Sequence, residues 1–150
     1  MATEPQRKQK NEIMREINYI AIHCSATKPS MDVPVERVLD WHLKRGWSDI
    51  GYHYYIRRNG AIFLGRDLKR PGAHVRGFNR DSIGVCYEGG IDENGKAEDN
   101  RTPEQKQALK NLLIVLKQRF PDAFIKGHRD FPNVSKACPS FDAELEYGYL

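Results

Sequence analysis

The sequence has no run of apolar residues long enough to cross a membrane, since a transmembrane helix needs roughly 18 of them. Residues 1–17, MATEPQRKQKNEIMREI, also lack the apolar core of a secretory signal peptide. These two absences predict a protein that is made in the cytoplasm without a signal peptide and does not insert into a membrane.

Cysteine is scarce, with only Cys24, Cys86 and Cys138 in the chain. An odd number of widely spaced thiols does not form the disulfide framework of a small secreted domain, so we expect reduced cysteines. Internal repeats and linkers are missing too. A length of 150 residues, with 39% apolar and 29% charged residues, is typical of one globular domain.

Acidic residues are nearly missing from residues 57–80, where seven arginine and lysine residues face a single aspartate, Asp67. Residues 88–99 are strongly acidic, and the net charge of the chain is +4. A basic stretch suits an anionic partner such as nucleic acid, an acidic membrane surface or a cell-wall polymer, although a solvated face is the default explanation. Charge alone therefore does not select a partner.

Residues 1–16 mix charges of both signs and contain few apolar positions. We interpret them as a flexible N-terminal arm that turns helical towards residues 12–16. The domain itself is then expected to span residues 17–150.

The first predicted strand covers residues 17–24, which are rich in β-branched and aromatic residues. Alternation places Ile20, Ile22 and Cys24 on one face, so Cys24 is interpreted as a small core side chain. His23 falls on the other face at the end of the strand. It is either a hydrogen-bonded, half-buried histidine or a ligand held rigidly at the edge of a sheet.

A helix is predicted from Pro34 to the stop signal Gly46, because apolar residues recur at helical spacing between them. Trp41 and Trp47 flank its end. His42 lies on or beside the apolar stripe. It is therefore either a buried histidine with satisfied hydrogen bonds or part of the rim of a groove.

A hairpin follows, with strands at residues 51–58 and 61–64 joined by Asn59-Gly60, the pair preferred in a two-residue type I′ turn. Tyr52 shares a strand face with Tyr54, which favours a packed aromatic side chain.

Residues 65–80 are rich in glycine and arginine and show little periodicity, so they are predicted to form a long loop, and loops of that length are often functional. His74 and Asn79 are its polar candidates. Residues 82–87 resume strand character. Cys86 within them is interpreted as a packing thiol, because no histidine or cysteine stands near it at ligand spacing.

A second helix begins at Thr102, where Pro103 and Gln105 complete a capping box with a preset first turn. Pro121 ends it, and a short strand over residues 123–127 follows. The predicted core face consists of Ala108, Leu109, Leu112, Leu113, Val115, Leu116 and Phe120. Irregular alternation of strands and helices around one hairpin predicts a single α/β domain with a central mixed sheet flanked by helices.

The segment from His128 to Cys138 brings an imidazole, the ammonium of Lys136 and a thiol within a few residues. Imidazole and thiolate are preferred zinc ligands, and a catalytic zinc ion typically has three protein ligands and an open position. His23, also at the end of a strand, is the best third ligand.

Several blocks of the sequence, in order, resemble the zinc-dependent N-acetylmuramoyl-L-alanine amidases of the peptidoglycan-recognition and phage-lysozyme type. Together they span most of residues 17–142. The matching blocks are Ile22–Ser30, Trp41-His42, Gly46–Tyr54, Gly65–Asp67, Gly72–His74, Ser82–Cys86, Gly89–Asp92 and Lys136–Asp142.

The resemblance implies a zinc amidase domain over residues 17–150, with one Zn²⁺ per chain bound by His23, His128 and Cys138. It further implies a catalytic role for Tyr52 and, as in the phage subgroup, for Lys136. We expect Tyr52 to hydrogen-bond the attacking water or the tetrahedral oxygen, and Lys136 to stabilise negative charge and pass a proton. The candidate substrate-binding residues are His74, Asn79 and His42.

The implied activity is hydrolysis of the amide between N-acetylmuramic acid and L-alanine in bacterial peptidoglycan, by a monomeric, phage-type lysis enzyme acting on the cell wall. The alternative is a non-catalytic peptidoglycan-recognition protein of the same fold. Such relatives commonly lack the cysteine ligand, so Cys138 favours the enzyme. Nucleic acid is not expected as a partner, because a nucleic-acid-binding zinc module calls for a closed four-ligand site.

Overall fold

The computed structural model describes residues 15–150, so the predicted flexible arm over residues 1–16 lies almost entirely outside the described residues. The last two residues of that arm are described and are not helical. The Arg15 guanidinium donates to the carbonyl oxygens of Leu68 (2.8 Å) and Ser82 (2.9 Å). The chain is therefore already fastened to the domain at Arg15.

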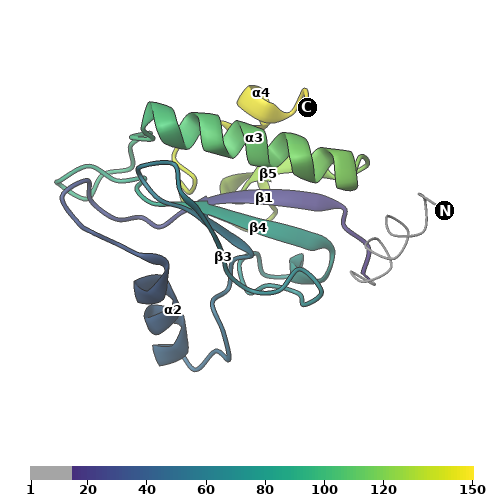
Figure 1. Cartoon of the computed structure of the whole chain (residues 1–150), viewed down its shortest axis with the longest axis horizontal. Helices are drawn as coiled ribbons and strands as arrows, with labels where there is room; N and C mark the ends of the chain where they lie inside the picture. The colour runs from purple at the N-terminus through teal and green to yellow at the C-terminus, as the bar shows by residue number, and fades with distance from the viewer. Residues whose placement is uncertain (1–14) are drawn as a thin grey trace.

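The centre of the molecule is one five-stranded mixed sheet, as the sequence predicts. Its strands are β1 (Tyr19–Cys24), β2 (Tyr54–Ile56), β3 (Ile62–Leu64), β4 (Ser82–Tyr87) and β5 (Phe124–Gly127). They lie in the order β3-β2-β4-β1-β5 (Figure 1). β1 runs parallel to both of its neighbours, β2 joins β4 in parallel, and only β2 and β3 are antiparallel.

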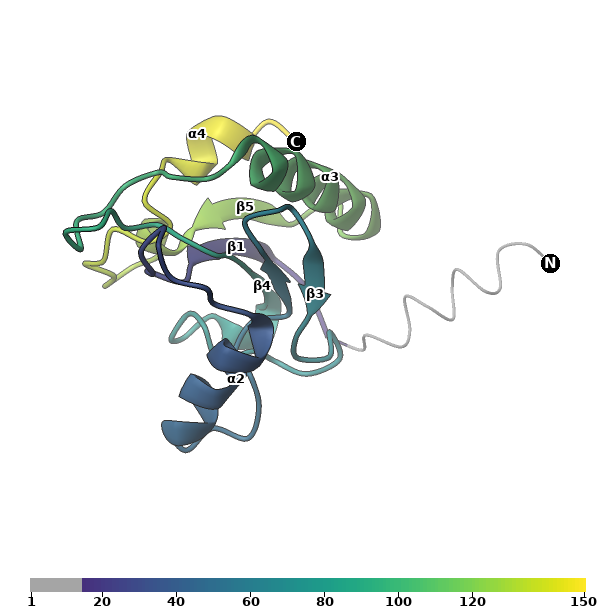
Figure 2. The ribbon, with the colours of Figure 1, turned by 60° about the vertical axis from the view of Figure 1, so that its left-hand side comes forward.

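Helices flank the sheet on both sides. α3 (Pro103–Arg119) lies along one face with the short α4 (Ala143–Tyr147) beside it, and α2 (Val35–Lys44) stands on the opposite side (Figures 1 and 2). Two 3-10 helices, η1 (Asn79–Asp81) and η2 (His128–Asp130), lie in the connecting segments. The predicted α/β domain is confirmed. None of the helices in residues 15–150 has the length and apolar character of a membrane span.

The main core fills the space between the sheet and α3. Ile22 and Cys24 of β1 point into it, as alternation predicts, and meet Leu109 and Leu113 of the helix. Val115 is instead 58% exposed, so its assignment to the core face was wrong. A helix turns by roughly 100° per residue, which places Val115 beside the buried stripe rather than within it.

Helix α3 begins as predicted. The Thr102 hydroxyl accepts a hydrogen bond from the Gln105 amide (3.0 Å), and the Gln105 side-chain oxygen accepts one from the Thr102 amide (3.0 Å). These reciprocal bonds satisfy two amides at the start of the helix. Gln105 also donates to the Glu88 carbonyl oxygen (2.9 Å), which ties the helix to the end of β4.

The turn between β2 and β3 differs from the predicted two-residue type I′ turn. The Gly60 amide donates to the Arg57 carbonyl oxygen (2.8 Å), and the Arg57 amide donates to the Ala61 carbonyl oxygen (2.9 Å), which leaves a three-residue loop. Gly60 has a φ of 86°, whereas Asn59 does not have the positive φ that a type I′ turn requires. Glycine thus takes the single left-handed position.

Candidate metal centre and substrate groove

Three side chains of the types that bind metal ions converge at the carboxyl end of the sheet. His23 lies near the end of β1, and His128 directly follows β5. The parallel register pairs Ile22 with Gly127, so the two strands deliver their imidazoles side by side, with ring centroids 4.6 Å apart. Cys138 completes the cluster, and the three ligand atoms lie within 4.8 Å of one another.

Cys138 is held in place through the backbone. Its sulfur accepts a hydrogen bond from the Cys24 amide (3.2 Å), and its carbonyl oxygen accepts one from the Arg129 amide (2.8 Å). A Cβ atom at Gly127 would lie 2.7 Å from Cδ of Pro139. The loop that carries Cys138 can therefore approach the end of β5 only because Gly127 has no side chain.

The protonation states of the three ligands suit a metal ion. Burial, followed by the charges of neighbouring histidines and Lys136, lowers the pKa of His23 well below its ordinary value. Burial and then Lys136 also lower the pKa of His128. Both imidazoles are therefore neutral, which is their ligand form. The hydrogen bond with Cys24 and burial raise the pKa of the Cys138 thiol, so a metal ion must displace its proton.

The donor set fits zinc. Zinc binds imidazole nitrogen at about 2.0–2.1 Å and thiolate sulfur at about 2.3 Å. A tetrahedral ion with such bond lengths holds its donors about 3.4–3.6 Å apart. The three atoms lie within 4.8 Å of one another, so a small inward movement of the side chains would let them share one ion. Because the protein supplies three ligands, a tetrahedral ion would keep one position open, as catalytic zinc sites do.

Tyr52 lies beside these ligands. Tyr52 is a packed aromatic side chain, as predicted, but it does not share a face with Tyr54, because β2 begins only at Tyr54 and the alternation does not reach back to Tyr52. The Tyr52 ring packs against a smaller core cluster that includes Tyr55 and Cys86, and its centroid lies 5.0 Å from that of His23. Burial raises the pKa of Tyr52 well above its ordinary value, so the phenol stays protonated and can donate a hydrogen bond.

The metal cluster opens into a groove of about 570 Å³. Lys136 is exposed within it, and its charge contributes to the lowered pKa of both histidine ligands. The structure thus brings together residues from β1, α2, the long loop and the C-terminal segment. All of the predicted site residues line this one groove: His23, His42, Tyr52, His74, Asn79, His128, Lys136 and Cys138.

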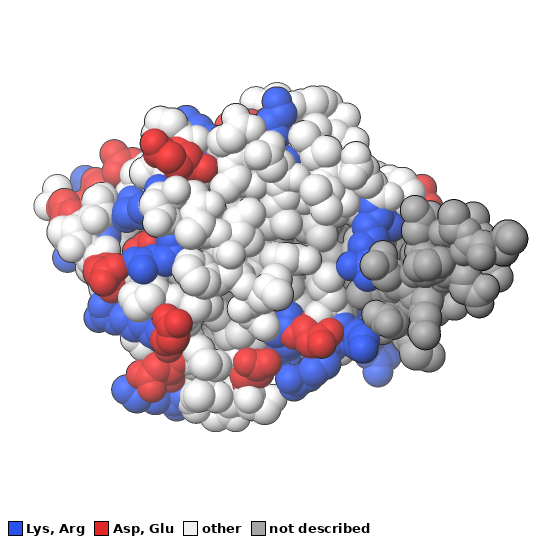
Figure 3. Space-filling view, viewed as in Figure 1, with Lys and Arg blue, Asp and Glu red and all other residues white. Residues whose placement is uncertain are grey.

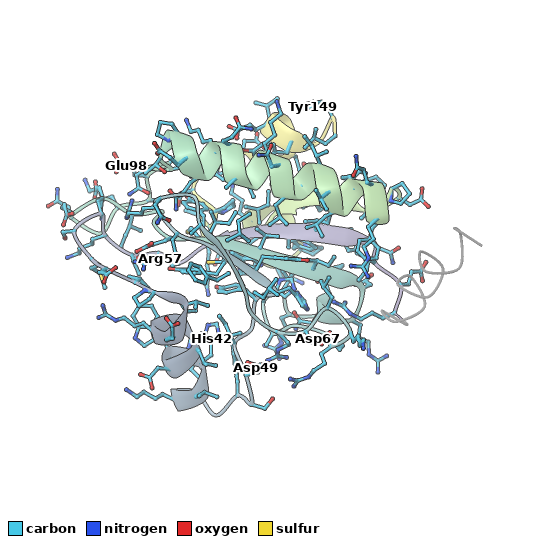
Figure 4. The ribbon with its side chains drawn as sticks, viewed as in Figure 1. His42, Asp49, Arg57, Asp67, Glu98 and Tyr149 are labelled. Carbon is cyan, nitrogen blue, oxygen red and sulfur yellow. The ribbon has the colours of Figure 1, made fainter. Side chains whose placement is uncertain are left out.

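His42 combines the two interpretations that the sequence left open. The side chain is 5% exposed, and its Nδ1 accepts a hydrogen bond from the Gly51 amide (2.9 Å). Burial lowers the pKa of His42 to about 4. The ring nevertheless lines the groove and packs against Trp47, with centroids 4.6 Å apart. Figure 4 shows His42 on the side of α2 that faces the sheet.

His74 and Asn79 reach the groove from the long loop, but both nitrogens of His74 and the side-chain oxygen of Asn79 already have partners within the protein. The Asn79 side-chain oxygen accepts hydrogen bonds from the amides of His74 and Val75, both at 2.9 Å. Nδ1 of His74 lies 2.8 Å from Nε2 of His23. Both side chains therefore form hydrogen bonds that support the site itself.

The sequence analysis did not assign three side chains that line the groove around the end of α2, namely Trp41, Arg45 and Trp47. Arg76, which belongs to the predicted basic stretch, lines the groove from the long loop. The Arg45 guanidinium lies over the Trp47 ring, 5.4 Å from its centroid. The available signal was the pair of tryptophans at the end of an amphipathic helix, which we treated only as flanking residues.

The basic stretch does not form a uniform anionic-ligand surface. Arg57 pairs with the buried Glu88 (3.0 Å), and Arg70 pairs with Asp49 (3.3 Å); Figure 4 labels Arg57 and Asp49. Arg66 is buried and donates to backbone carbonyl oxygens. Figure 3 likewise shows acidic and basic side chains interspersed over one face of the molecule. Much of the excess charge is therefore used to hold loops together.

A mixed α/β domain with two histidines and one cysteine at the carboxyl end of its sheet, and with room for a fourth ligand, has the arrangement of a metal-dependent hydrolase. Comparison with known families agrees. The family model described as N-acetylmuramoyl-L-alanine amidase matches residues 13–141. The chain belongs to this family and is an N-acetylmuramoyl-L-alanine amidase, which confirms the expected family and activity.

Individual relatives give the same picture. The endolysin of Klebsiella phage KP32 is 49% identical over 128 residues, covering 85% of this chain and 83% of the relative. The endolysin of Escherichia phage T7 is 47% identical over 123 residues, covering 82% and 80%. The solved structure of the amidase LysC from Clostridium intestinale URNW superimposes with a TM-score of 0.75 at 29% identity, covering 89% and 83%.

Proposed function

We propose that the chain is a zinc-dependent, phage-type lysis enzyme that cleaves the amide between N-acetylmuramic acid and L-alanine in bacterial peptidoglycan, acting at the cell wall as a monomer. The observation that carries the proposal is the convergence of His23, His128 and Cys138 within 4.8 Å. The complete ligand set speaks against a recognition protein without catalysis. The similarity to two phage endolysins over most of the chain supports the biological role.

One Zn²⁺ held by His23, His128 and Cys138 would supply a Lewis acid that activates water at neutral pH and polarises the scissile carbonyl group. The protein's part is to hold the ligands and to place the amide. The nearly complete burial of His23, which is 1% exposed, fixes one side of the site. The groove leaves the other side open to an extended substrate.

Tyr52 and Lys136 contribute to the chemistry in two different ways. Because Tyr52 is neutral, its hydroxyl acts as a hydrogen-bond donor to the oxygen that gains negative charge in the transition state. Lys136 brings a positive charge to the same groove and donates a proton to the departing amine. Amide hydrolysis requires both stabilisation of the oxyanion and protonation of the leaving amine, since the carbonyl is weakly electrophilic and an amine is a poor leaving group.

The groove wall gives the substrate two kinds of contact. Trp41 and Trp47 offer flat apolar surfaces, Arg45 offers positive charge for the carboxylates of a peptide stem, and the exposed Arg76 offers it for anionic polymers of the wall. His42 forms part of the wall between them. We place the sugar and peptide contacts here, because the floor of the groove is taken up by the metal ligands, Tyr52 and their supporting residues.

The decisive experiment is digestion of purified sacculi with and without a chelator, followed by mass analysis of the products. We expect free stem peptides and intact glycan strands, and no products after zinc is removed until zinc is added back. Cut glycan strands would contradict the proposed bond specificity. Binding to sacculi without any release of peptide would instead indicate a recognition protein.

A further inference from the structure

Behind the metal cluster, a chain of hydrogen-bonding groups runs from His23 into the sheet. His23 points Nδ1 towards the Cys138 sulfur, 4.0 Å away, and Nε2 towards Nδ1 of His74, 2.8 Å away. Nε2 of His74 lies 3.1 Å from the hydroxyl oxygen of Ser82, which is fully buried on β4. Both nitrogens of His74 therefore have a partner inside the protein.

The direction of these hydrogen bonds follows from the ligand atom. If Nδ1 of His23 binds the ion, it carries no proton, so Nε2 carries one and donates it to Nδ1 of His74. Nε2 of His74 then carries the second proton and donates it to the Ser82 hydroxyl. Each imidazole is neutral, and each is fixed in one tautomer by the group behind it.

The His74 ring occupies a slot that two glycines make possible. A Cβ atom at Gly84 would lie 2.8 Å from Cγ of the ring, and one at Gly72 would lie 2.6 Å from Cδ2. Asn79 accepts hydrogen bonds from two successive backbone amides, those of His74 and Val75, and so anchors this part of the loop. The ring stands at 82° to that of His23, with centroids 4.9 Å apart. Nδ1 of His74 is thus held opposite Nε2 of His23 by the path of the loop, by the space at the two glycines and by Asn79.

We propose that His74 is a positioning residue for the ligand His23: it accepts the hydrogen bond that sets the ring orientation and the tautomer, with Ser82 as the second link and Asn79 as its backbone anchor. The inference rests on the proposed zinc site. It gives both residues a role other than the expected substrate binding, which rested on family resemblance for His74 and on residue type within the long loop for Asn79.

The test compares zinc affinity in the wild type, His74→Leu and His74→Asn, measured on the full chain by competition with a chromophoric chelator. Loss of a hydrogen-bond partner behind a metal ligand typically lowers metal affinity about 10–100-fold, and we expect that loss in His74→Leu. His74→Asn keeps an acceptor oxygen near the position of Nδ1, so its affinity should stay within a few-fold of the wild type. His42→Leu is the control and should leave zinc affinity unchanged, because His42 is buried in the same groove wall but its Nδ1 accepts a hydrogen bond from the Gly51 amide rather than from a candidate ligand.

Each outcome decides one question. A wild type that binds no zinc overturns the proposed zinc site itself. A wild type that binds one zinc ion, with unchanged affinity in His74→Leu and a higher KM for a soluble muropeptide, makes His74 a substrate-binding residue and overturns the inference. Equal loss in the Leu and Asn variants overturns the hydrogen-bond assignment. If His74→Leu does not fold, Ser82→Ala takes its place, and it must lower zinc affinity several-fold.

Discussion

The Tyr52 ring lies 5.0 Å from the His23 ring, centroid to centroid, and at 48° to it. The two residues are separated by α2 in the sequence, and Tyr52 belongs to no strand. Burial holds the Tyr52 phenol in its neutral form next to His23, one of the three proposed zinc ligands. A neutral hydroxyl beside a bound ion would serve as a hydrogen-bond donor rather than as a base, and this proposed role is open to direct test.

Tyr52→Phe should bind zinc normally but hydrolyse peptidoglycan about 100–1000-fold more slowly, the usual effect of removing one donor to a developing oxyanion. Turnover of a soluble muropeptide and zinc content are the measurements. Tyr54→Phe is the matched control, because Tyr54 packs towards the α3 core and should lose little activity. Near-normal turnover in Tyr52→Phe would exclude the proposed role.

Cys138→Ser should lower the affinity for zinc by more than about 100-fold, because the substitution removes the proposed thiolate ligand. Loss of a hydrogen bond that only orients a ligand costs at most roughly 100-fold in affinity. Zinc stoichiometry after dialysis measures the effect. Cys86→Ala serves as the control, since Cys86 is fully buried on β4 and is not part of the ligand cluster. Retention of one zinc ion per chain in Cys138→Ser would show that the ligand set is wrong.

Arg76→Gln should slow the digestion of cell walls while leaving the turnover of a small soluble muropeptide largely unchanged. Arg76 is exposed at the groove, where its charge attracts the anionic wall, and the effect should shrink as salt is added. Arg70→Gln provides the comparison, because Arg70 is engaged with Asp49. Equal effects of the two substitutions would mean that only net charge matters.

Burial lowers the pKa of His53 to about 4, from about 6.5 in an unfolded chain. The unfolded state therefore binds more protons between pH 6.5 and 4, and the free energy of unfolding falls as the pH falls through this window. One such group contributes about 1.4 kcal/mol per pH unit. Urea unfolding of the zinc-free protein at several pH values should show a shallower decline for His53→Gln than for the wild type. Identical slopes would show that His53 is protonated in the folded state.

Arg101→Met should lower the free energy of unfolding by about 2–3 kcal/mol, somewhat less than the loss of a fully buried ion pair. The Arg101 side chain is 0% exposed, pairs with Asp99 and Glu146 and lies 3.5 Å from the centroid of the Phe141 ring, but its two acidic partners remain partly exposed. Arg129→Ala, at an exposed position, should change stability by about 0.5 kcal/mol or less. Chemical denaturation compares the two variants.

Periodicity and capping predict the elements whose stability is local. Helix α3 carries both a capping box and an apolar stripe, and β4 is a continuous buried run, so each appears where the pattern indicates. The predictions were wrong where the local conformation depends on backbone geometry or on a neighbouring segment rather than on the residue pattern. The turn at Gly60 depends on which residue takes a positive φ, and Tyr52 changes faces because the backbone leaves the β-ladder before Tyr54.

The candidate ligands could be predicted from their residue types and from their positions at strand ends. The place where the three side chains come together could not be predicted. That point depends on the register between β1 and β5, which pairs Ile22 with Gly127 and which no local pattern specifies. The contact between His23 and His74 depends further on the path of a long loop without periodicity. Family resemblance supplied the residues, and the structure shows how they lie relative to one another.

His23 and Cys138 are 115 positions apart in the sequence, yet both face the same small volume. An ion held by both would act as a removable crosslink that closes most of the chain into one loop. Binding to the native state alone would add about 2.7 kcal/mol of stability at a free zinc concentration 100 times the Kd. The supply of zinc outside the cell would then set how long the folded enzyme survives there, as well as how fast it works.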